Sequence, residues 1–131
     1  AGPTYEPIDP VRFVGNHSTG KMGYDLAEEA ARNGAEVFLV SGPSHLRLQN
    51  PNIHITRVQT ADQMHKACIE VYAEVDIAIA AAAVADYRPK NVAPEKIKKK
   101  DSCLHLELEK TVDILADLGS KKEKQFLVGF A

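Results

Sequence analysis

Segments with strand-like and helix-like apolar patterns alternate along this chain, and this alternation limits the folds that it can adopt. Small apolar residues recur at helical spacing from Gly23 to Ala31, and Gly34 predicts the end of that helix. Later patterns predict strands over residues 36–41, 53–58 and 76–83, a helix over 61–73, a half-exposed strand over 103–109, a short helix over 112–118 and a buried strand over 126–130. The sequence therefore predicts an α/β fold with a mainly parallel sheet and right-handed crossovers.

Length and charge narrow the class of protein further. The 131 residues, of which 44% are hydrophobic, suffice for one domain with its own core. A net charge of −2 gives no reason to expect nucleic acid or an anionic membrane as partner. No apolar run approaches the roughly 20 residues that cross a bilayer, and no signal peptide opens the chain. We therefore expect a cytoplasmic protein.

The ends and the cysteines of the chain add two expectations. The chain starts with AGPT, like the exit of a strand, and it stops within an apolar strand. We expect residues 1–131 to form a nucleotide-binding domain that is a fragment of a longer one, truncated at both ends. Cys68 and Cys103 lack metal-binding spacing, and both are expected to be reduced core thiols.

A glycine-rich loop, residues 15–23, directly precedes the first predicted helix. Backbone N–H groups and the helix dipole attract anions at such a position, so the loop predicts a phosphate site. Its spacing is close to that of a P-loop, but Met22 stands where a hydroxyl should hold magnesium. Alternatively, Gly20 and Gly23 only serve the turn and close helix packing, although the polar residues 16–18 favour a site.

An NAD(P)-binding oxidoreductase is a second reading of the same pattern, because that fold also opens with a strand, a glycine-rich turn and a helix. The glycines at 15, 20 and 23 do not form GxGxxG. The second predicted strand ends at Ser41 without an acidic residue for a ribose 2′-hydroxyl. This alternative stays open, as does a non-catalytic nucleotide-binding module.

The run from Ala80 to Arg88 carries a strand of very small residues to Asp86, just past its carboxyl end. Ligands of open α/β sheets bind at these strand ends. Small side chains allow close approach, and the Asp86 carboxylate can accept hydrogen bonds from a base or a ribose. On the other interpretation, Asp86 only caps a turn.

Six basic residues and one acidic residue, Glu95, lie between positions 88 and 100 of this otherwise acidic chain. Tyr87 is the only nearby aromatic residue on which a base could stack. The cluster therefore favours neutralisation of a triphosphate over binding of nucleic acid.

Three motifs occur in series: GPTYEPIDPVRFVGNHSTGKMG, AAAVADYRP and VAPEKIKKK. Through them the chain resembles bacterial phosphopantothenoylcysteine synthetase over nearly its whole length. That domain is commonly fused to a flavin-dependent decarboxylase, so FMN is expected only if such a part precedes this one. The resemblance implies a Rossmann-like three-layer fold with the nucleotide at the carboxyl strand ends, usually dimeric, with CTP and Mg²⁺.

The resemblance also implies a ligase reaction in coenzyme A biosynthesis. The carboxylate of 4′-phosphopantothenate attacks the α-phosphate of CTP, giving an acyl cytidylate and pyrophosphate. The cysteine amine then attacks the acyl carbon. The choice of CTP over ATP stays open at this point.

Carried over by position, the resemblance implies roles for individual residues. Asn16 would hold the acyl-nucleotide intermediate, Arg12 would shape its pocket and Lys96 would contact the triphosphate. Asp86 would contact the cytosine nucleotide, and Phe130 would lie at the base pocket. The remaining expected contacts are Gly15, Ser18, Gly20 and Ala82 for the intermediate and Thr111, Val112, Asp113 and Ile114 for the nucleotide. Many relatives carry Asn-Pro-Asp-Ile at the last four positions, and this chain departs from that pattern at Thr111 and Val112.

Overall fold

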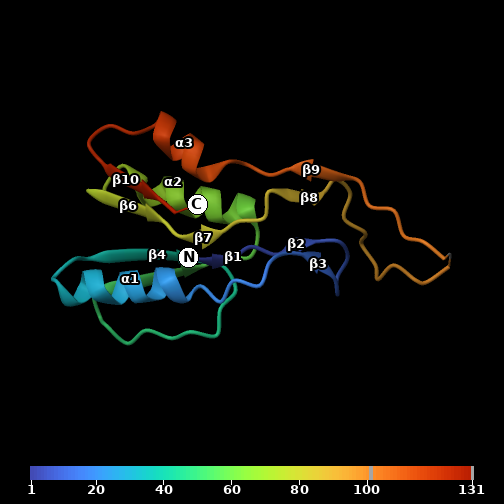
Figure 1. Ribbon diagram of the computed structural model, residues 1–131, viewed down its shortest axis with the longest axis horizontal. Helices are drawn as coiled ribbons and strands as arrows, with labels where there is room; N and C mark the ends of the chain where they lie inside the picture. The colour runs from blue at the N-terminus through green and yellow to red at the C-terminus, as the bar shows by residue number, and fades with distance from the viewer. Residues whose placement is uncertain (101, 131) are drawn as a thin grey trace.

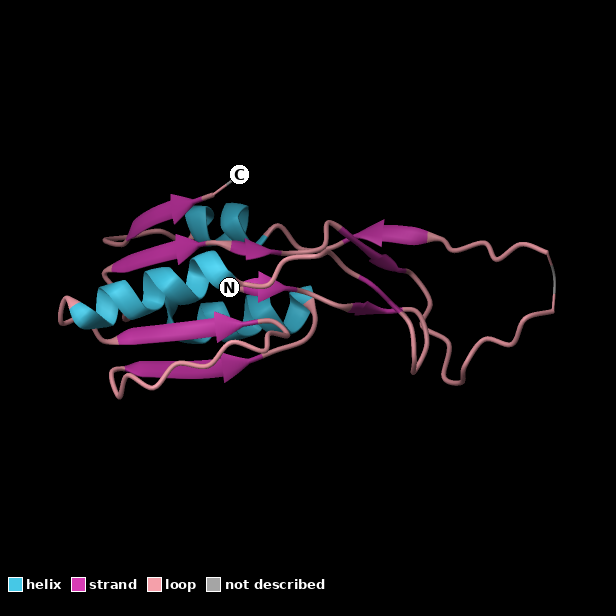
Figure 2. Cartoon of the chain, turned by 60° about the horizontal axis from the view of Figure 1, so that its bottom comes forward, coloured by secondary structure: helices cyan, strands magenta, loops and turns pink. Residues whose placement is uncertain are grey.

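The computed structural model describes residues 1–100 and 102–130. Parallel strand pairs form its centre: β4 (Val37–Ser41) with β5 (Ile53–Arg57), β1 (Gly2–Pro3) with β7 (Ala82–Ala83), and β6 (Ile77–Ala80) with β10 (Phe126–Gly129). The Ala1 amino group donates to the Val40 carbonyl at 2.6 Å, and the Gly42 N–H donates to the Ala1 carbonyl at 2.9 Å. These two bonds join β1 to β4. Since β6 and β7 are consecutive, all six strands lie in one layer (Figure 2).

Helices cover both faces of this layer, α1 (Lys21–Arg32) on one and α2 (Ala61–Tyr72) with α3 (Ile114–Ser120) on the other (Figures 1 and 2). Successive strand residues point to opposite faces. Accordingly, Leu39 packs with Tyr24 of α1, whereas Val40 packs against the cluster that contains Met64 of α2. The predicted α/β fold with three layers and a mainly parallel sheet is confirmed.

The predicted core elements are confirmed, with small shifts at their ends. The helix expected over 112–118 begins at Ile114 because Asp113 is its N-cap: its carboxylate accepts the Ala116 N–H at 2.9 Å. The helix expected over 61–73 ends at Tyr72, and a capping box of Thr60 and Gln63 fixes its start. The strand expected over 76–83 is interrupted at Ala81.

Two short antiparallel pairs form an arm that the sequence did not predict. Here β2 (Glu6–Pro7) pairs with β3 (Phe13–Val14), and β8 (Tyr87–Pro89) pairs with β9 (Leu108–Lys110). The predicted loop after Asp86 therefore begins with a strand, and the strand expected over 103–109 is reduced to its last residues. We call residues 6–14 and 87–110, of which 101 is not described, the arm. It projects from the sheet (Figure 1).

The predicted burial of the last strand and of Cys103 is wrong. Phe126 is 66% exposed and its register partner Ile77 is 60% exposed, because α1 packs over β4 and β5 rather than over β6 and β10. Cys103 is exposed in the segment between β8 and β9, while Cys68 is half-buried. Neither thiol is in a disulfide within the described chain. No helix of the described ranges is long and apolar enough to cross a membrane.

Candidate functional site

The glycine-rich loop and the strand of small residues meet through the side chain of Asn16. Its Nδ2 donates to the Ala83 carbonyl at 2.6 Å, and its Oδ1 accepts the Ser18 N–H at 3.0 Å. One amide group therefore joins the loop to the carboxyl end of β7. The Nδ2 group carries a second N–H, which stays available for another acceptor.

The loop ends at Gly20, which is the N-cap of α1 and has a φ of 81°. This left-handed conformation favours glycine, and an added Cβ would lie 3.0 Å from the Gly2 Cα. The Ser18 hydroxyl accepts the Gly20 N–H at 3.2 Å. In the described part of the chain, the N–H groups of Met22 and Gly23 have no acceptor. The first turn of α1 thus presents unpaired donors and a positive dipole end.

The backbone just beyond β7 is held from two sides by threonines. Thr4, fully buried, accepts the Ala85 N–H on its Oγ1 at 2.9 Å. Thr111 donates its hydroxyl to the Ala85 carbonyl at 2.6 Å, and its N–H to the Asp86 carbonyl at 2.9 Å. These three bonds fix the turn from which the Asp86 side chain projects. Sequence reasoning missed Thr4, because nothing local marks its partner 81 residues away.

Asp86 itself is exposed, and its carboxylate has no hydrogen-bond partner in residues 1–100 and 102–130. A carboxylate in this state can accept bonds from a ligand. Its place, just past the carboxyl end of the parallel strand β7, is the one the sequence predicted. Contact with a nucleotide stays a prediction.

The four residues from Thr111 to Ile114 offer a ligand mainly backbone groups. The Thr111 hydroxyl is bound to Ala85, and the Asp113 carboxylate caps α3. Ile114 is buried in the core, and Val112 packs against the same cluster. Their expected contacts with the nucleotide stay predictions.

The other expected contacts lie around the same strand ends. Phe130 follows β10, with its N–H bound to the Ala80 carbonyl at 3.0 Å and its side chain 52% exposed. Ala82 pairs with Gly2 inside the sheet, and Gly15 is exposed after β3. Their ligand contacts are also untested.

Arg12 and Lys96 are the two expected site residues that the structure does not bring to these strand ends. Arg12 lies on the arm, where its guanidinium binds Asp9 and the Ile97 carbonyl. Lys96 belongs to the exposed segment between β8 and β9, which runs away from the sheet (Figures 1 and 2). Their predicted roles therefore require the arm and the strand ends to approach each other.

Two of the six basic residues are engaged within the protein. Arg88 binds Asp62 at 2.5 Å and Glu109 at 3.0 Å, and these carboxylates, Asp62 first, raise the pKa of its guanidinium further. Lys90 binds Glu107 at 3.1 Å. The remaining basic residues are exposed and form no ion pair with a described carboxylate: Lys96, Lys98, Lys99 and Lys100. Of the six, these four have no carboxylate partner among residues 1–100 and 102–130.

Comparison with known proteins places this geometry in a family. The family model described as "DNA/pantothenate metabolism flavoprotein C-terminal domain" matches residues 1–131. The chain belongs to this family. The resemblance drawn from the three motifs is thereby confirmed.

Three relatives illustrate the extent of the match. The chain is 54% identical to the coenzyme A biosynthesis bifunctional protein CoaBC of Bacillus subtilis, over 100% of this chain and 32% of that protein. A crystal structure of the C-terminal domain of a CoaBC protein superposes with a TM-score of 0.85 at 51% identity, covering 100% of this chain and 61% of that one. A DNA/pantothenate metabolism flavoprotein from Streptococcus pneumoniae gives the same TM-score at 26% identity, covering 97% and 65%. The chain thus spans about a third of that curated relative, and its expected place in a longer domain stays a prediction.

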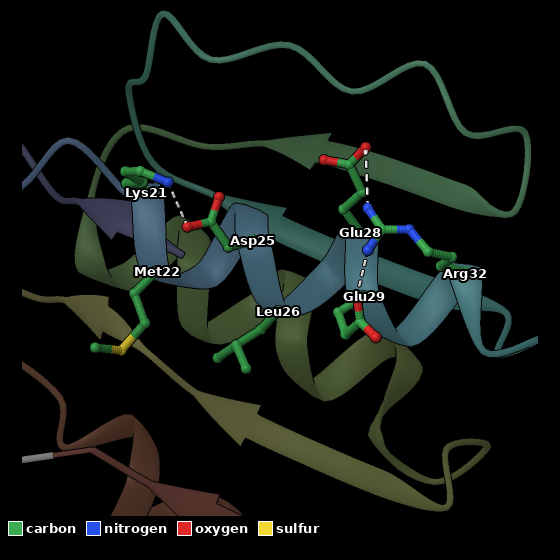
Figure 3. Close-up of a pocket in the computed structure, with 7 residues that line it drawn as sticks. All are labelled: Lys21, Met22, Asp25, Leu26, Glu28, Glu29 and Arg32. Atoms are coloured by element: carbon green, nitrogen blue, oxygen red, sulfur yellow. Dashed lines mark hydrogen bonds and ion pairs between the residues drawn. The ribbon is translucent and has the colours of Figure 1, made fainter.

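A hollow lined by side chains of α1 runs along this helix from its first turn to Arg32 (Figure 3). Its charged residues pair with one another: Lys21 binds Asp25 at 2.5 Å, and Arg32 binds Glu28 and Glu29. Because these exposed charges are already paired within the helix, none of them is directed at a ligand. The carboxyl strand ends are the better candidate site.

Proposed function

We propose that this chain is the nucleotide-binding part of a ligase of coenzyme A biosynthesis that joins 4′-phosphopantothenate to cysteine with CTP. The observation that carries the proposal is the meeting of Asn16, the first turn of α1 and the Asp86 turn at one sheet edge. The relatives named for coenzyme A biosynthesis support it, since they match the entire chain.

The reaction consists of two displacements. A carboxylate oxygen of 4′-phosphopantothenate attacks the α-phosphorus of CTP, and the bond to the bridging oxygen of pyrophosphate breaks. The cysteine amine then attacks the acyl carbon, CMP leaves, and the amine loses a proton. Such steps depend on positioning and charge neutralisation more than on a side-chain nucleophile.

The residues of the strand ends have the groups that these steps need. The unpaired N–H groups of Met22 and Gly23 would receive phosphate oxygens, and the second N–H of Asn16 would hold an oxygen of the acyl cytidylate. Asp86 would accept hydrogen bonds from the cytosine or ribose. Lys96 would neutralise the triphosphate when the arm approaches the strand ends.

The side chains at the strand ends offer few ligands for Mg²⁺. No group of three or more potential metal-binding side chains occurs among residues 1–100 and 102–130. Mg²⁺ that accompanies a triphosphate is usually held by one or two carboxylates besides the phosphates, and the exposed carboxylate at the strand ends, Asp86, is already assigned to the cytosine or ribose. When bound, the ion would neutralise negative charge on the triphosphate. FMN enters this proposal only if the whole protein also contains a decarboxylase part, as the word bifunctional in the relatives' names suggests.

Nucleotide binding by the full-length protein tests the proposal. In isothermal titration we expect CTP to bind more tightly than ATP, and NAD not to bind. Asp86→Asn should weaken CTP binding by roughly ten- to a hundredfold, because a site built around polar contacts discriminates strongly. Asp76→Asn is the matched control, since Asp76 is an exposed carboxylate before β6, at the opposite end of the strands.

Equal binding of CTP and ATP, unchanged in Asp86→Asn, would contradict the choice of CTP. Tight binding of NAD would favour the oxidoreductase alternative. Nucleotide binding without any ligase activity of the full-length protein would favour a non-catalytic module.

We also propose that two copies of the protein associate through their arms. Apolar side chains that are 40% or more exposed gather there: Val11, Phe13, Tyr87, Val92, Leu104, Leu106 and Leu108. Soluble proteins rarely leave such a set uncovered unless it binds a partner. Leu104→Asp should convert a dimer of the full-length protein to a monomer in sedimentation experiments. Dissociation by Ile77→Asp but not by Leu104→Asp would instead place the interface on the open face of β6.

A further inference from the structure

The buried carboxylate of Asp9 connects two parts of the arm that are distant in sequence. Its side chain is fully shielded from solvent, and Oδ1 accepts the N–H groups of Val11 and Arg12 at 2.9 and 2.8 Å. Oδ2 accepts Nε and Nη2 of Arg12 at 2.9 and 2.5 Å, and the Ile97 N–H at 3.1 Å. A carboxylate that accepts five hydrogen bonds fixes the positions of the five donor groups relative to one another.

Arg12 completes this connection at the carbonyl group of the same residue, Ile97. Its Nη2 donates to the Ile97 carbonyl at 2.8 Å, while its own carbonyl accepts the N–H groups of Ile8 and Asp9 in the hairpin turn. The Ala93 N–H adds a bond of 3.0 Å to the Ile8 carbonyl. Ile97 is therefore bound at both its N–H and its C=O, 88 residues from Asp9 in sequence.

Ile97 differs from its neighbours in the basic segment both in burial and in its hydrogen bonds. It is the half-buried residue within KIKKK, and the lysines on either side of it are exposed. Fixing the Ile97 backbone fixes the starting point of the Lys96 side chain, whereas Lys99 and Lys100 lie beyond the anchor. Without the anchor, Lys96 would belong to a mobile polar loop, and ordering it would oppose ligand binding.

We propose that Asp9 is a positioning residue: with Arg12 it anchors the lysine-bearing segment to the β2–β3 hairpin at Ile97, so that the arm delivers Lys96 to the triphosphate as one body. This inference depends on the proposed function only in naming a triphosphate as the group that Lys96 contacts. The pKa of Asp9 lies well below its usual range because Arg12 and the backbone donors stabilise the charged form, so the anchor persists across neutral and mildly acidic pH.

Asp9→Asn in the full-length protein tests the anchor, because an amide NH₂ would then face N–H donors. We expect hydrogen exchange of the Ile97 amide to accelerate at least tenfold, and CTP affinity to fall about tenfold with CMP affinity unchanged. In a Lys96→Gln background the same substitution should cause no further loss of CTP affinity, because Asp9 acts through Lys96. Glu107→Gln, which removes an exposed ion pair of the arm, is the matched control and should change none of these values.

Several outcomes would overturn the proposal. Unchanged Ile97 exchange in Asp9→Asn would show that there is no anchor. Equal losses of CTP and CMP, or an equal loss with and without Lys96, would show a general structural role. If Asp9→Asn does not fold, Ile97→Pro removes the N–H that Asp9 accepts, together with the half-buried side chain and part of the backbone freedom of Lys96, and must give at least the same loss of CTP affinity. A wild-type protein that does not bind CTP would reject the proposed function, while Ile97 exchange would still decide whether the anchor exists.

Discussion

Gly42→Ala is expected to destabilise this domain severely. A Cβ at this position would lie 1.6 Å from the Pro3 carbonyl oxygen and 2.8 Å from its carbonyl carbon. Both atoms are backbone atoms of β1, which pairs with β7 and so cannot move without losing that pairing. The substitution would also disturb the bond from the Gly42 N–H to Ala1 that joins β1 to β4.

Forced separation of packed backbone costs more than about 3 kcal/mol, against a total stability of roughly 5–15 kcal/mol for a domain of this kind. Urea unfolding followed by circular dichroism measures the loss. Gly34→Ala is the matched control: Gly34 has a φ of 91° but no atom within 4 Å of an added Cβ, so it isolates backbone strain of about 1 kcal/mol. A loss in Gly42→Ala no larger than that in Gly34→Ala would contradict the close contact.

Asn16→Asp is expected to lower turnover of the full-length enzyme by about 10²–10³-fold, the effect of removing one preorganised donor from a reacting oxygen. The carboxylate would place an oxygen against the Ala83 carbonyl, where Nδ2 now donates at 2.6 Å. It would also remove the second N–H that we assign to the intermediate. Because that N–H acts after CTP is cleaved, acyl cytidylate should accumulate in single-turnover experiments.

Asn50→Asp is the matched control, since the Asn50 Oδ1 accepts the Asn52 N–H at 3.0 Å in an exposed loop and a carboxylate can do the same. Normal product formation by Asn16→Asp would contradict any role of its amide in the reaction. Complete loss of CTP binding would show that Asn16 acts before the intermediate forms.

The sequence alone determined the central layers of this protein. The helical stripe of small residues before Gly34 and the apolar segments 36–41, 53–58 and 76–83 predicted a mainly parallel sheet with helical crossovers, as observed. The arrangement in three layers was implied by the family resemblance of the sequence. The spacing of apolar residues shows which face of a helix or strand is buried. That face can therefore be predicted without knowing which element packs against it. The pattern of small residues also predicted correctly that Asp86 follows the carboxyl end of a strand, and the glycine-rich loop was predicted correctly to precede the first helix.

Only the tertiary structure decided the arm, the open strand face and the partners of the polar side chains. Strands as short as β8 and β9 form because residues about twenty positions apart pair, and no local pattern records that pairing. Phe126 carries the apolar signature of a buried residue, but burial also requires a helix above it, and α1 lies elsewhere. The bonds from Thr4 to Ala85 and from Asp9 to Ile97 join residues more than eighty positions apart. Such contacts depend on where the folded chain brings two backbones together, which the type of a residue does not specify.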